Sequence, residues 1–492
     1  MSPIGHAIAD PTTAAQIAAQ VCGGERSARS VVDEHLARIE AHDDEIHAFN
    51  LVIADQARTA ADEIDARLAA GEDVGPLAGV PVALKDNMCT RGVATTCSSK
   101  ILDNWEPPYD ATVVTRLRDA GAILVGKTNL DEFAMGSSTE NSAFGPTRNP
   151  HDTSRVPGGS SGGSSASVAA GFSPLAFGSD TGGSIRQPAA LCGVVGVKPT
   201  YGVVSRYGLV AFASSLDQIG PFSHTVADSA VALDVIGGPD PFDSTSIPEQ
   251  LPPLSDVLDR GVDGLRIGIV SELCGNGIEG IADDVLARTQ EAATALEKAG
   301  ATVGEVSVPS TIYGLSAYYL IAPAEASSNL ARFDGVRYGL RVDGPSTAAM
   351  QTATRTAGFG DEVKRRIMLG TYALSAGYYD AFYGKAQKVR TLILDDFARA
   401  YEDFDLLLCP TSPSTAFELG AKTADPLTMY LNDVCTIPSN LSGQPAMSVP
   451  FGVGDDGLPV GVQILAPTLG EPTMFQAAAA LESLAPTARG AS

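Results

Sequence analysis

The sequence predicts an α/β fold whose central sheet, mixed or largely parallel, is covered by helices on both faces. Short apolar runs suited to buried strands alternate with longer amphipathic runs suited to helices along most of the 492 residues. A hydrophobic content of 44% and a charged content of 18% are typical of an ordered globular protein. Length alone allows two to four domains.

The alternation begins with two polar amphipathic helices. They are predicted over residues 27–70, and Ser27 or Ser30 is the expected N-cap because a serine hydroxyl can accept from the first free backbone N–H groups. Residues 77–86, "LAGVPVALKD", then predict a strand whose end carries Lys85. This lysine therefore lies at the edge of the predicted sheet.

The same pattern continues toward the C-terminus. Residues 110–129 predict a helix, a glycine stop and a buried strand, and residues 174–193 predict a short strand, a tight glycine turn and a helix. Further strands and helices are predicted within 265–272, 282–308, 404–410 and 458–467. The acidic, proline-rich segment 238–262 is predicted to be a connector, or else only a surface loop.

Acidic residues dominate the charge of the chain. It has 58 aspartates and glutamates against 33 lysines and arginines, a net charge of -25, and only nine of those 33 are lysines. A solvated acidic shell suits a protein kept soluble at high salt, so we expect a halophilic source, specifically a halophilic archaeon, over an ordinary acidic protein. The same charge argues against nucleic-acid binding by this chain alone, because phosphates require basic patches.

Cysteines, histidines and apolar runs point to a soluble cytoplasmic protein. The seven cysteines form no CxxC pair and are odd in number, which favours reduced thiols over disulfides or a zinc site. The six histidines have no metal-ligand spacing, and no GxxxxGK[ST] motif is present. No apolar run approaches membrane-spanning length. We therefore expect no metal, no bound nucleotide and no membrane contact.

Two glycine- and serine-rich stretches carry the chemistry. "VPGGSSGGSSASVAAG" (156–171) has the composition of a linker but leads directly into an alanine-rich helical pattern, and "GSDTGGSIRQP" follows a predicted strand. Ser160 and Ser184 lie in these stretches. A serine nucleophile needs a base, and the nearby His151 and His224 have no recognisable setting. A lysine, here Lys85, can serve if burial lowers its pKa so that the neutral amine is available.

The turn around "DTGGS" suits an oxyanion hole. Glycines at 182 and 183 allow the tight backbone geometry and a close approach of substrate. Consecutive backbone N–H groups could then point at one spot near the start of the following helix. The glycine- and serine-rich stretches are therefore interpreted as a site and not as a spacer.

The two stretches, with "VPVALKDN" upstream and "KPTYG" downstream, resemble the signature of the amidase signature family. The resemblance implies that family's fold in a single domain, 1–492, with a helical segment to about 70 and a catalytic core over 71–237 and 263–492. It implies that Ser184 is the acyl-forming nucleophile, that Ser160, on a cis peptide after Gly159, relays the proton, and that Lys85 is the terminal base. It places the oxyanion hole at the backbone of Thr181, Gly182 and Gly183, with Ser184.

Four further segments resemble the glutaminase subunits of tRNA-dependent amidotransferases within this family: 133–150, 317–339, 358–393 and 425–452. Glutamine carries an ammonium and a carboxylate beside its amide, so its pocket needs one acidic and one basic side chain. The resemblance implies Asp433 and Arg366 for these roles, with Tyr318 contributing a hydroxyl. Three neighbours stay open as alternatives, namely Arg365, Tyr319 and Asp425.

The same resemblance implies partners. The ammonia released from glutamine would pass through a tunnel to a B subunit that uses ATP and magnesium, a small C subunit would bridge the two, and this chain would hold no cofactor. The B subunit would amidate aspartate or glutamate mischarged on tRNA(Asn) or tRNA(Gln), and either or both acceptors remain open. A free-standing amidase of small amides and a catalytically silent scaffold are the alternatives.

Overall fold

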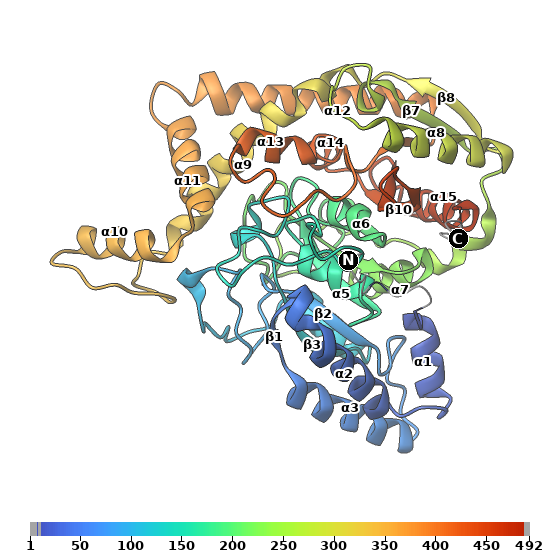
Figure 1. The fold of residues 1–492 in the computed structure, drawn as a ribbon, viewed down its shortest axis with the longest axis horizontal. Helices are drawn as coiled ribbons and strands as arrows, with labels where there is room; N and C mark the ends of the chain where they lie inside the picture. The colour runs from blue at the N-terminus through green and yellow to red at the C-terminus, as the bar shows by residue number, and fades with distance from the viewer. Residues whose placement is uncertain (1–6, 8–10, 487–492) are drawn as a thin grey trace.

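The structure, a computed structural model, describes residue 7 and residues 11–486, so both ends of the predicted domain 1–492 lie outside the described residues. In that part of the chain eleven strands form one mixed sheet in the order β1-β3-β2-β4-β6-β5-β10-β11-β9-β7-β8 (Figure 1). Helices flank the sheet on both faces. The predicted α/β fold with a mixed sheet is therefore confirmed.

The strands are β1 Phe49–Val52, β2 Pro81–Lys85, β3 Ile123–Thr128, β4 Leu175–Asp180, β5 Val195–Lys198, β6 Gln218–Ser223, β7 Arg266–Val270, β8 Thr302–Val306, β9 Leu406–Pro410, β10 Ala446–Val453 and β11 Pro459–Leu465. The trio β3, β2 and β4 is parallel, and so is the trio β9, β7 and β8. Antiparallel pairs join the two trios through β6, β5, β10 and β11. The sheet thus has two parallel ends around an antiparallel centre, with β1 added as an antiparallel edge.

The helices are α1 Ala14–Cys22, α2 Ala28–Ile46, α3 Ala54–Ala69, α4 Thr112–Asp119, α5 Gly162–Ala169, α6 Arg186–Cys192, α7 Val226–Ile236, α8 Asp283–Lys298, α9 Gly314–Asn329, α10 Thr347–Gly358, α11 Asp361–Leu374, α12 Lys385–Asp403, α13 Pro426–Tyr430, α14 Ile437–Ser442 and α15 Glu471–Leu484. The two helices predicted within 27–70 are α2 and α3, and Ser27 caps α2 by accepting from Ser30 N at 3.0 Å. The four-residue strand β1 between them was not predicted. None of the described helices is long and apolar enough to cross a membrane.

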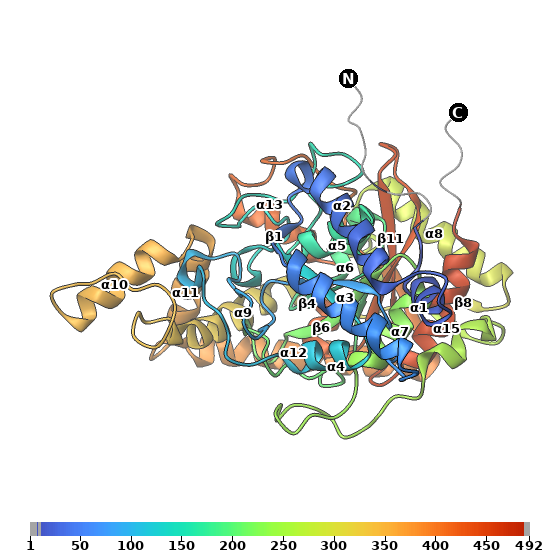
Figure 2. The same ribbon diagram turned by 90° about the horizontal axis from the view of Figure 1, so that it is seen from below.

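Two hydrophobic cores support different parts of the molecule. The main core includes Leu84, Phe177 and Ile185 and lies around the sheet. The second core includes Tyr318 and Val363 and lies among α9, α11 and α12. Figure 2 shows α2 and α3 across the middle of the view and α10 projecting at the left end, beyond α11. The elements that carry the candidate residues come from both cores, so the site lies where the two meet.

Candidate active site

The structure brings Lys85 and Ser160 into direct contact beside the turn that carries Ser184. Lys85 ends β2, Ser160 precedes α5, and Ser184 lies between β4 and α6. Lys85 Nζ donates to Ser160 Oγ at 2.8 Å, and the Gly159–Ser160 peptide is cis, as the family resemblance implied. Ser161 N donates to Ser184 O at 3.2 Å, which ties the loop of Ser160 to the turn of Ser184. Ser184 keeps 7% of its surface exposed, whereas Lys85 and Ser160 keep none.

The amine of Lys85 is buried among hydroxyls. Besides Ser160, its Nζ donates to Ser161 Oγ at 2.8 Å and to Ser179 Oγ and O at 3.0 and 3.2 Å. Burial lowers the pKa of Lys85 to about 7, with the more distant carboxylates acting in the opposite sense. A substantial fraction of neutral amine is therefore present near neutral pH, which a base needs. Ser161 and Ser179 were not predicted as part of the site, although both lie in the two glycine- and serine-rich stretches.

A second buried lysine shows that a lowered pKa alone does not define a base. Burial also lowers the pKa of Lys198, at the end of β5, to about 7. Its Nζ donates to backbone carbonyl oxygens, those of Pro199 at 3.4 Å and Gln444. Because no hydroxyl that could pass on a proton is among these partners, we assign Lys198 a structural role.

The turn after β4 presents backbone N–H groups, but not all four that were expected. Gly183 N donates to Asp180 Oδ1 at 2.8 Å, so its N–H group is occupied. Within the described chain the N–H groups of Thr181, Gly182 and Ser184 have no hydrogen-bond partner. Gly183 instead gives the turn its shape, since its φ of 139° favours glycine and an added Cβ would meet Thr436 Oγ1 at 2.1 Å.

A buried ion pair fixes this turn. Arg186 Nε and Nη2 donate to the carboxylate of Asp180 at 3.0 Å, and both side chains are fully buried. Burial opposes ionisation, but Arg186 lowers the pKa of Asp180 to about 2. The other guanidinium bonds reach across the molecule to Ser439, Asn440 and Gln463, each at 2.6 Å, and to Thr436 O at 3.1 Å. All charged groups of the pair thus have partners, which is what a buried ion pair requires.

The loop with the cis peptide is supported by Asp131, which was not predicted as a site residue. Its carboxylate accepts from Thr139 N at 2.8 Å and Asn141 N at 3.1 Å. Thr139 Oγ1 in turn donates to Gly158 O at 2.8 Å. Phe133 and Thr139 have φ of 52° and 59°, a conformation that β-branched and bulky residues rarely adopt. Such backbone clusters at functional sites, but no local pattern in the sequence shows it.

Tyr318 lies against the turn, and Tyr319 does not. A Cβ added to Gly182 would meet Tyr318 Cζ at 2.7 Å and its hydroxyl at 2.8 Å. Tyr319 stacks on Tyr430 with ring centroids 3.9 Å apart, and its hydroxyl is buried without a partner in the described chain. Of the two alternatives, the structure therefore places Tyr318 beside the reactive turn and Tyr319 in the wall behind it.

The same distinction separates two arginines of α11. Arg366 is 2% exposed and its Nε donates to Glu362 Oε1 at 2.8 Å. The side chain of Arg365 is 43% exposed and pairs with the same carboxylate from outside. Burial lowers the pKa of Arg366, but Tyr319 and Glu362 raise it. The net effect is a pKa well above the ordinary value. Arg366 is therefore the permanently charged cation of the interior.

Asp433 is the corresponding buried anion. Its Oδ2 accepts from Ser137 Oγ at 2.5 Å, and burial raises its pKa to about 7, while Ser137 and Arg366 act in the opposite sense. The alternative, Asp425, is exposed and caps α13 by accepting from Leu427 N at 3.0 Å. The structure thus brings Asp433, Arg366 and Tyr318 to the interior and leaves Asp425 and Arg365 at the surface.

This arrangement suits acyl transfer to a serine. It combines a hydroxyl at an accessible turn, a lysine that can be neutral, unpaired backbone N–H groups and, nearby, one cation and one anion. A substrate amide that carries both charges would find a complement for each. Across the described ranges, no three histidine, cysteine or acidic side chains gather as metal ligands, and the seven cysteines are free thiols.

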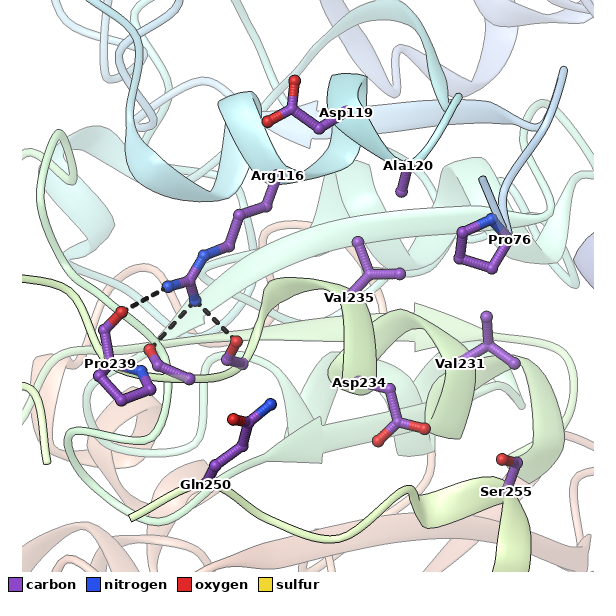
Figure 3. Close-up of a pocket in the computed structure, with 12 residues that line it drawn as sticks. Pro76, Arg116, Asp119, Ala120, Val231, Asp234, Val235, Pro239, Gln250 and Ser255 are labelled. Atoms are coloured by element: carbon purple, nitrogen blue, oxygen red, sulfur yellow. Dashed lines mark hydrogen bonds between the residues drawn. The ribbon is translucent and has the colours of Figure 1, made fainter. Parts of the chain in front are cut away.

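A surface pocket of about 650 Å³ lies apart from this site, between α4, α7 and the chain that follows α7 (Figure 3). Arg116 points into this region and donates to the carbonyl oxygens of Ile236, Gly237, Gly238 and Pro239, at 2.7 to 3.1 Å. These bonds satisfy carbonyl groups at the C-terminal end of α7. The arginine is therefore used by the fold and is not a free ligand for an anion.

Comparison with known proteins agrees with the geometry. The model of the family described as Amidase matches residues 30–475, and the chain belongs to this family. It is 62% identical to the A subunit of the glutamyl-tRNA(Gln) amidotransferase of Acidothermus cellulolyticus over 476 residues, 96% of this chain and 94% of that one. It is 58% identical to the A subunit of the same enzyme from Acaryochloris marina over 459 residues, 93% of this chain and 95% of that one.

Solved structures show the same relation. A crystal structure of the A subunit of the glutamyl-tRNA(Gln) amidotransferase of Thermotoga maritima is 46% identical, with a TM-score of 0.78 over 93% of this chain and 92% of that one. A 6-aminohexanoate cyclic dimer hydrolase complexed with substrate is 30% identical, with a TM-score of 0.83 over 97% of this chain and 98% of that one. The similar proteins named here come from bacteria, so the expected halophilic archaeal origin is not supported.

Proposed function

We propose that the chain is the A subunit, the glutaminase, of a glutamyl-tRNA(Gln) amidotransferase. One observation carries the proposal. Lys85, hydrogen-bonded to Ser160, lies beside the turn of Ser184, and the same interior also holds a buried cation, Arg366, and a buried anion, Asp433. Glutamine presents its carboxylate and ammonium beside the scissile amide, so its charges complement those two side chains. The similarity to the A subunits of this enzyme supports this choice over a free-standing amidase.

In the first half of the reaction Ser184 Oγ attacks the side-chain amide carbon of glutamine. Its proton passes to Ser160 as Ser160 gives its own to the neutral amine of Lys85. The carbonyl oxygen becomes an oxyanion, which the unpaired N–H groups of Thr181, Gly182 and Ser184 stabilise by hydrogen bonds aimed at the developing charge. The C–N bond then breaks, the proton returns through Ser160 to nitrogen, and ammonia leaves a glutamyl ester on Ser184.

In the second half water attacks that ester. Ser160 and Lys85 take the proton of the water as they took that of Ser184, and the same N–H groups stabilise the second oxyanion. The ester C–O bond breaks, the proton returns to Ser184 Oγ, and glutamate is released. The cycle balances with one water consumed and one ammonia and one glutamate formed.

The ammonia is used by partners. A B subunit with ATP and magnesium activates the carboxyl group of glutamate mischarged on tRNA(Gln), a C subunit bridges the two chains, and ammonia reaches the B subunit through a tunnel. The names of the relatives favour Glu-tRNA(Gln), and Asp-tRNA(Asn) is a second acceptor to test. Because the mischarged tRNA binds the B subunit, the net charge of -25 on this chain is compatible with a tRNA-dependent reaction.

The test is ammonia release from glutamine by the chain co-expressed with its B and C subunits, in high potassium chloride because the acidic charge still predicts a salt requirement. Asparagine and aliphatic amides serve as competing substrates. Release specific for glutamine and raised by ATP with Glu-tRNA(Gln) would support the proposal. Hydrolysis of many amides, indifferent to partners and tRNA, would instead show a free-standing amidase.

A further inference from the structure

The guanidinium of Arg366 is held at one edge and free at the other. Its Nε donates to Glu362 Oε1 at 2.8 Å, one turn earlier on α11. Tyr430, the last residue of α13, donates its hydroxyl to that same oxygen at 2.8 Å. The two Nη atoms of Arg366 make no hydrogen bond within the described chain. These two Nη atoms form one edge of the planar guanidinium, and their parallel N–H groups match the two oxygens of a carboxylate.

Aromatic rings surround this guanidinium. Its carbon lies 5.2 Å from the ring centroids of Tyr319 and Tyr430 and 5.7 Å from that of Phe212. The rings of Tyr319 and Tyr430 are themselves stacked, which makes the wall rigid. Arginine stacks on such faces more readily than lysine does, because its charge is planar and weakly hydrated. The rings attract the charge but offer it no directional hydrogen bond, so they do not set the direction in which the Nη atoms point.

Glu362 supplies the missing constraint. Its carboxylate bonds Nε from behind, and Tyr430 fixes the position of that carboxylate from a different segment of the chain, 68 residues away. Arg365 bonds the second carboxylate oxygen from the solvent side. The carboxylate of Glu362 therefore has partners on both α11 and α13, and the Nη atoms of Arg366, unbonded within the described chain, face the interior.

We infer that Glu362 and Tyr430 are positioning residues that direct the free edge of Arg366 at the α-carboxylate of the substrate and so help to select glutamine. This inference rests on the proposed glutaminase function. Neither residue touches the reacting amide, so their effect reaches the substrate only through Arg366. Loss of the constraint should weaken substrate binding and leave the acylation chemistry at Ser184 largely unchanged.

The experiment measures kcat and KM for ammonia release by the assembled complex of this chain with its B and C subunits. Glu362→Ala should raise KM for glutamine about 20-fold with kcat within about 3-fold, and Tyr430→Phe, which removes one hydroxyl, should raise KM about 3-fold. Glu362→Gln keeps the shape and one acceptor oxygen and should lie between the two. The matched control is Arg365→Gln, which removes the outer partner of Glu362 and should leave KM within about 2-fold.

A second substrate separates positioning from a general structural role. The α-amide of L-glutamine keeps the scissile amide and the ammonium but has no α-carboxylate for Arg366 to bind. Wild type should use it with a much higher KM than glutamine, and Glu362→Ala should leave the kinetics of this substrate unchanged. An equal loss on both substrates would show that Glu362 only supports the fold, and an unchanged KM for glutamine in Glu362→Ala would also overturn the inference.

The failure of this inference differs from that of the proposed function. A wild-type complex that does not distinguish glutamine from its α-amide would disprove the glutamine pocket itself. A wild-type complex that prefers glutamine, with a preference that Glu362→Ala retains in full, would disprove only the role of Glu362. Because Glu362→Gln and Tyr430→Phe are conservative, a poorly folded Glu362→Ala still leaves two variants that decide between these outcomes.

Discussion

Two buried cations face the same site and behave in opposite ways. Lys85, in the sheet, has hydroxyl and carbonyl partners and no ion-pair partner among the described residues, and burial lowers its pKa to about 7. Arg366, in the helical part, is equally buried but has Glu362 at 2.8 Å and three rings around it, and its pKa is raised. Both groups are desolvated, and the higher intrinsic pKa of a guanidinium, together with the partners of Arg366, keeps that group charged while Lys85 can become neutral.

The difference matches what each region has to do. A base must give up its charge to accept a proton, so a buried amine among neutral groups is suitable. A group that binds a carboxylate must stay charged in every state, so a guanidinium paired with a carboxylate is suitable. In the proposed function the sheet therefore carries the chemistry and the helices α9, α11 and α13 carry the recognition, and we expect that each can be altered without the other.

The largest effect should come from the sheet side. Ser184→Ala removes the attacking atom, so glutamine hydrolysis should fall by about 10⁴-fold or more while glutamine still binds. Ammonia release measures the first expectation and equilibrium dialysis with labelled glutamine the second. Ser173→Ala, at a buried serine paired with Ser167 Oγ at 3.0 Å, is the control and should keep full activity. Retained hydrolysis in Ser184→Ala would mean that another group is the nucleophile.

The pH dependence should separate the two regions. Lys85 must be neutral and Asp433 ionised, and because both have a pKa of about 7, activity should fall as pH drops below 7. Two groups act in the free enzyme, so log kcat/KM should fall with a slope approaching two, whereas kcat should fall with a slope of one because bound ammonium keeps Asp433 ionised. In Asp433→Asn the slope of kcat/KM should be one. A slope of two in that variant would remove Asp433 from the explanation.

The recognition side should show in KM alone. Arg366→Lys keeps the charge but loses the fork, so KM for glutamine should rise about 100-fold with kcat within about 5-fold. Arg365→Lys, at the exposed neighbour, should change KM by less than about 2-fold. Steady-state ammonia release at varied glutamine concentration measures KM and kcat for both variants. If Arg366→Lys lowered kcat at unchanged KM, the separation of chemistry from recognition would be wrong.

A smaller effect is expected where the two regions meet. Thr181 Oγ1 donates to Asp217 at 2.7 Å, and Asp217 also accepts from Phe212 N at 2.9 Å, so this carboxylate links the oxyanion turn to one wall of the Arg366 site. Thr181→Val removes the link and should lower kcat about 10-fold. Thr181→Ser keeps the hydroxyl and should stay within about 2-fold of wild type. Equal losses in both variants would point to packing and not to this hydrogen bond.

The smallest effect should come from salt. Potassium chloride screens repulsion on a surface with a net charge of -25, so raising it from 0.1 to 2 M should raise Tm by about 5 °C. The Lys85–Ser160 contact is buried, so kcat should change by less than about 2-fold. Differential scanning calorimetry measures Tm, and ammonia release measures kcat. A Tm that falls with salt would show that repulsion between the acidic side chains does not limit the stability of the fold.

Much of the fold followed from local patterns. The strand that ends at Lys85, the strand and helix around Ser184 and the capped helix after Ser27 all have short-range signals of burial or capping, and the structure has each of them. The strand β1 has only four residues, too few for a periodic pattern. The helices α9 to α12 surround a core of their own, and their amphipathic faces became interpretable only once that core was seen.

The sequence by itself determined which chemical groups are present and in which turns: two glycine-rich stretches with serines, a lysine at a strand end, and an arginine and an aspartate in helical segments. Only the tertiary structure decided their states. Asp433 meets Ser137 across 296 residues, and Arg366 rather than Arg365 faces the interior because α11 turns that side toward α9. Charge and pKa depend on burial and partners, and both arise from contacts between distant segments, which no local pattern records.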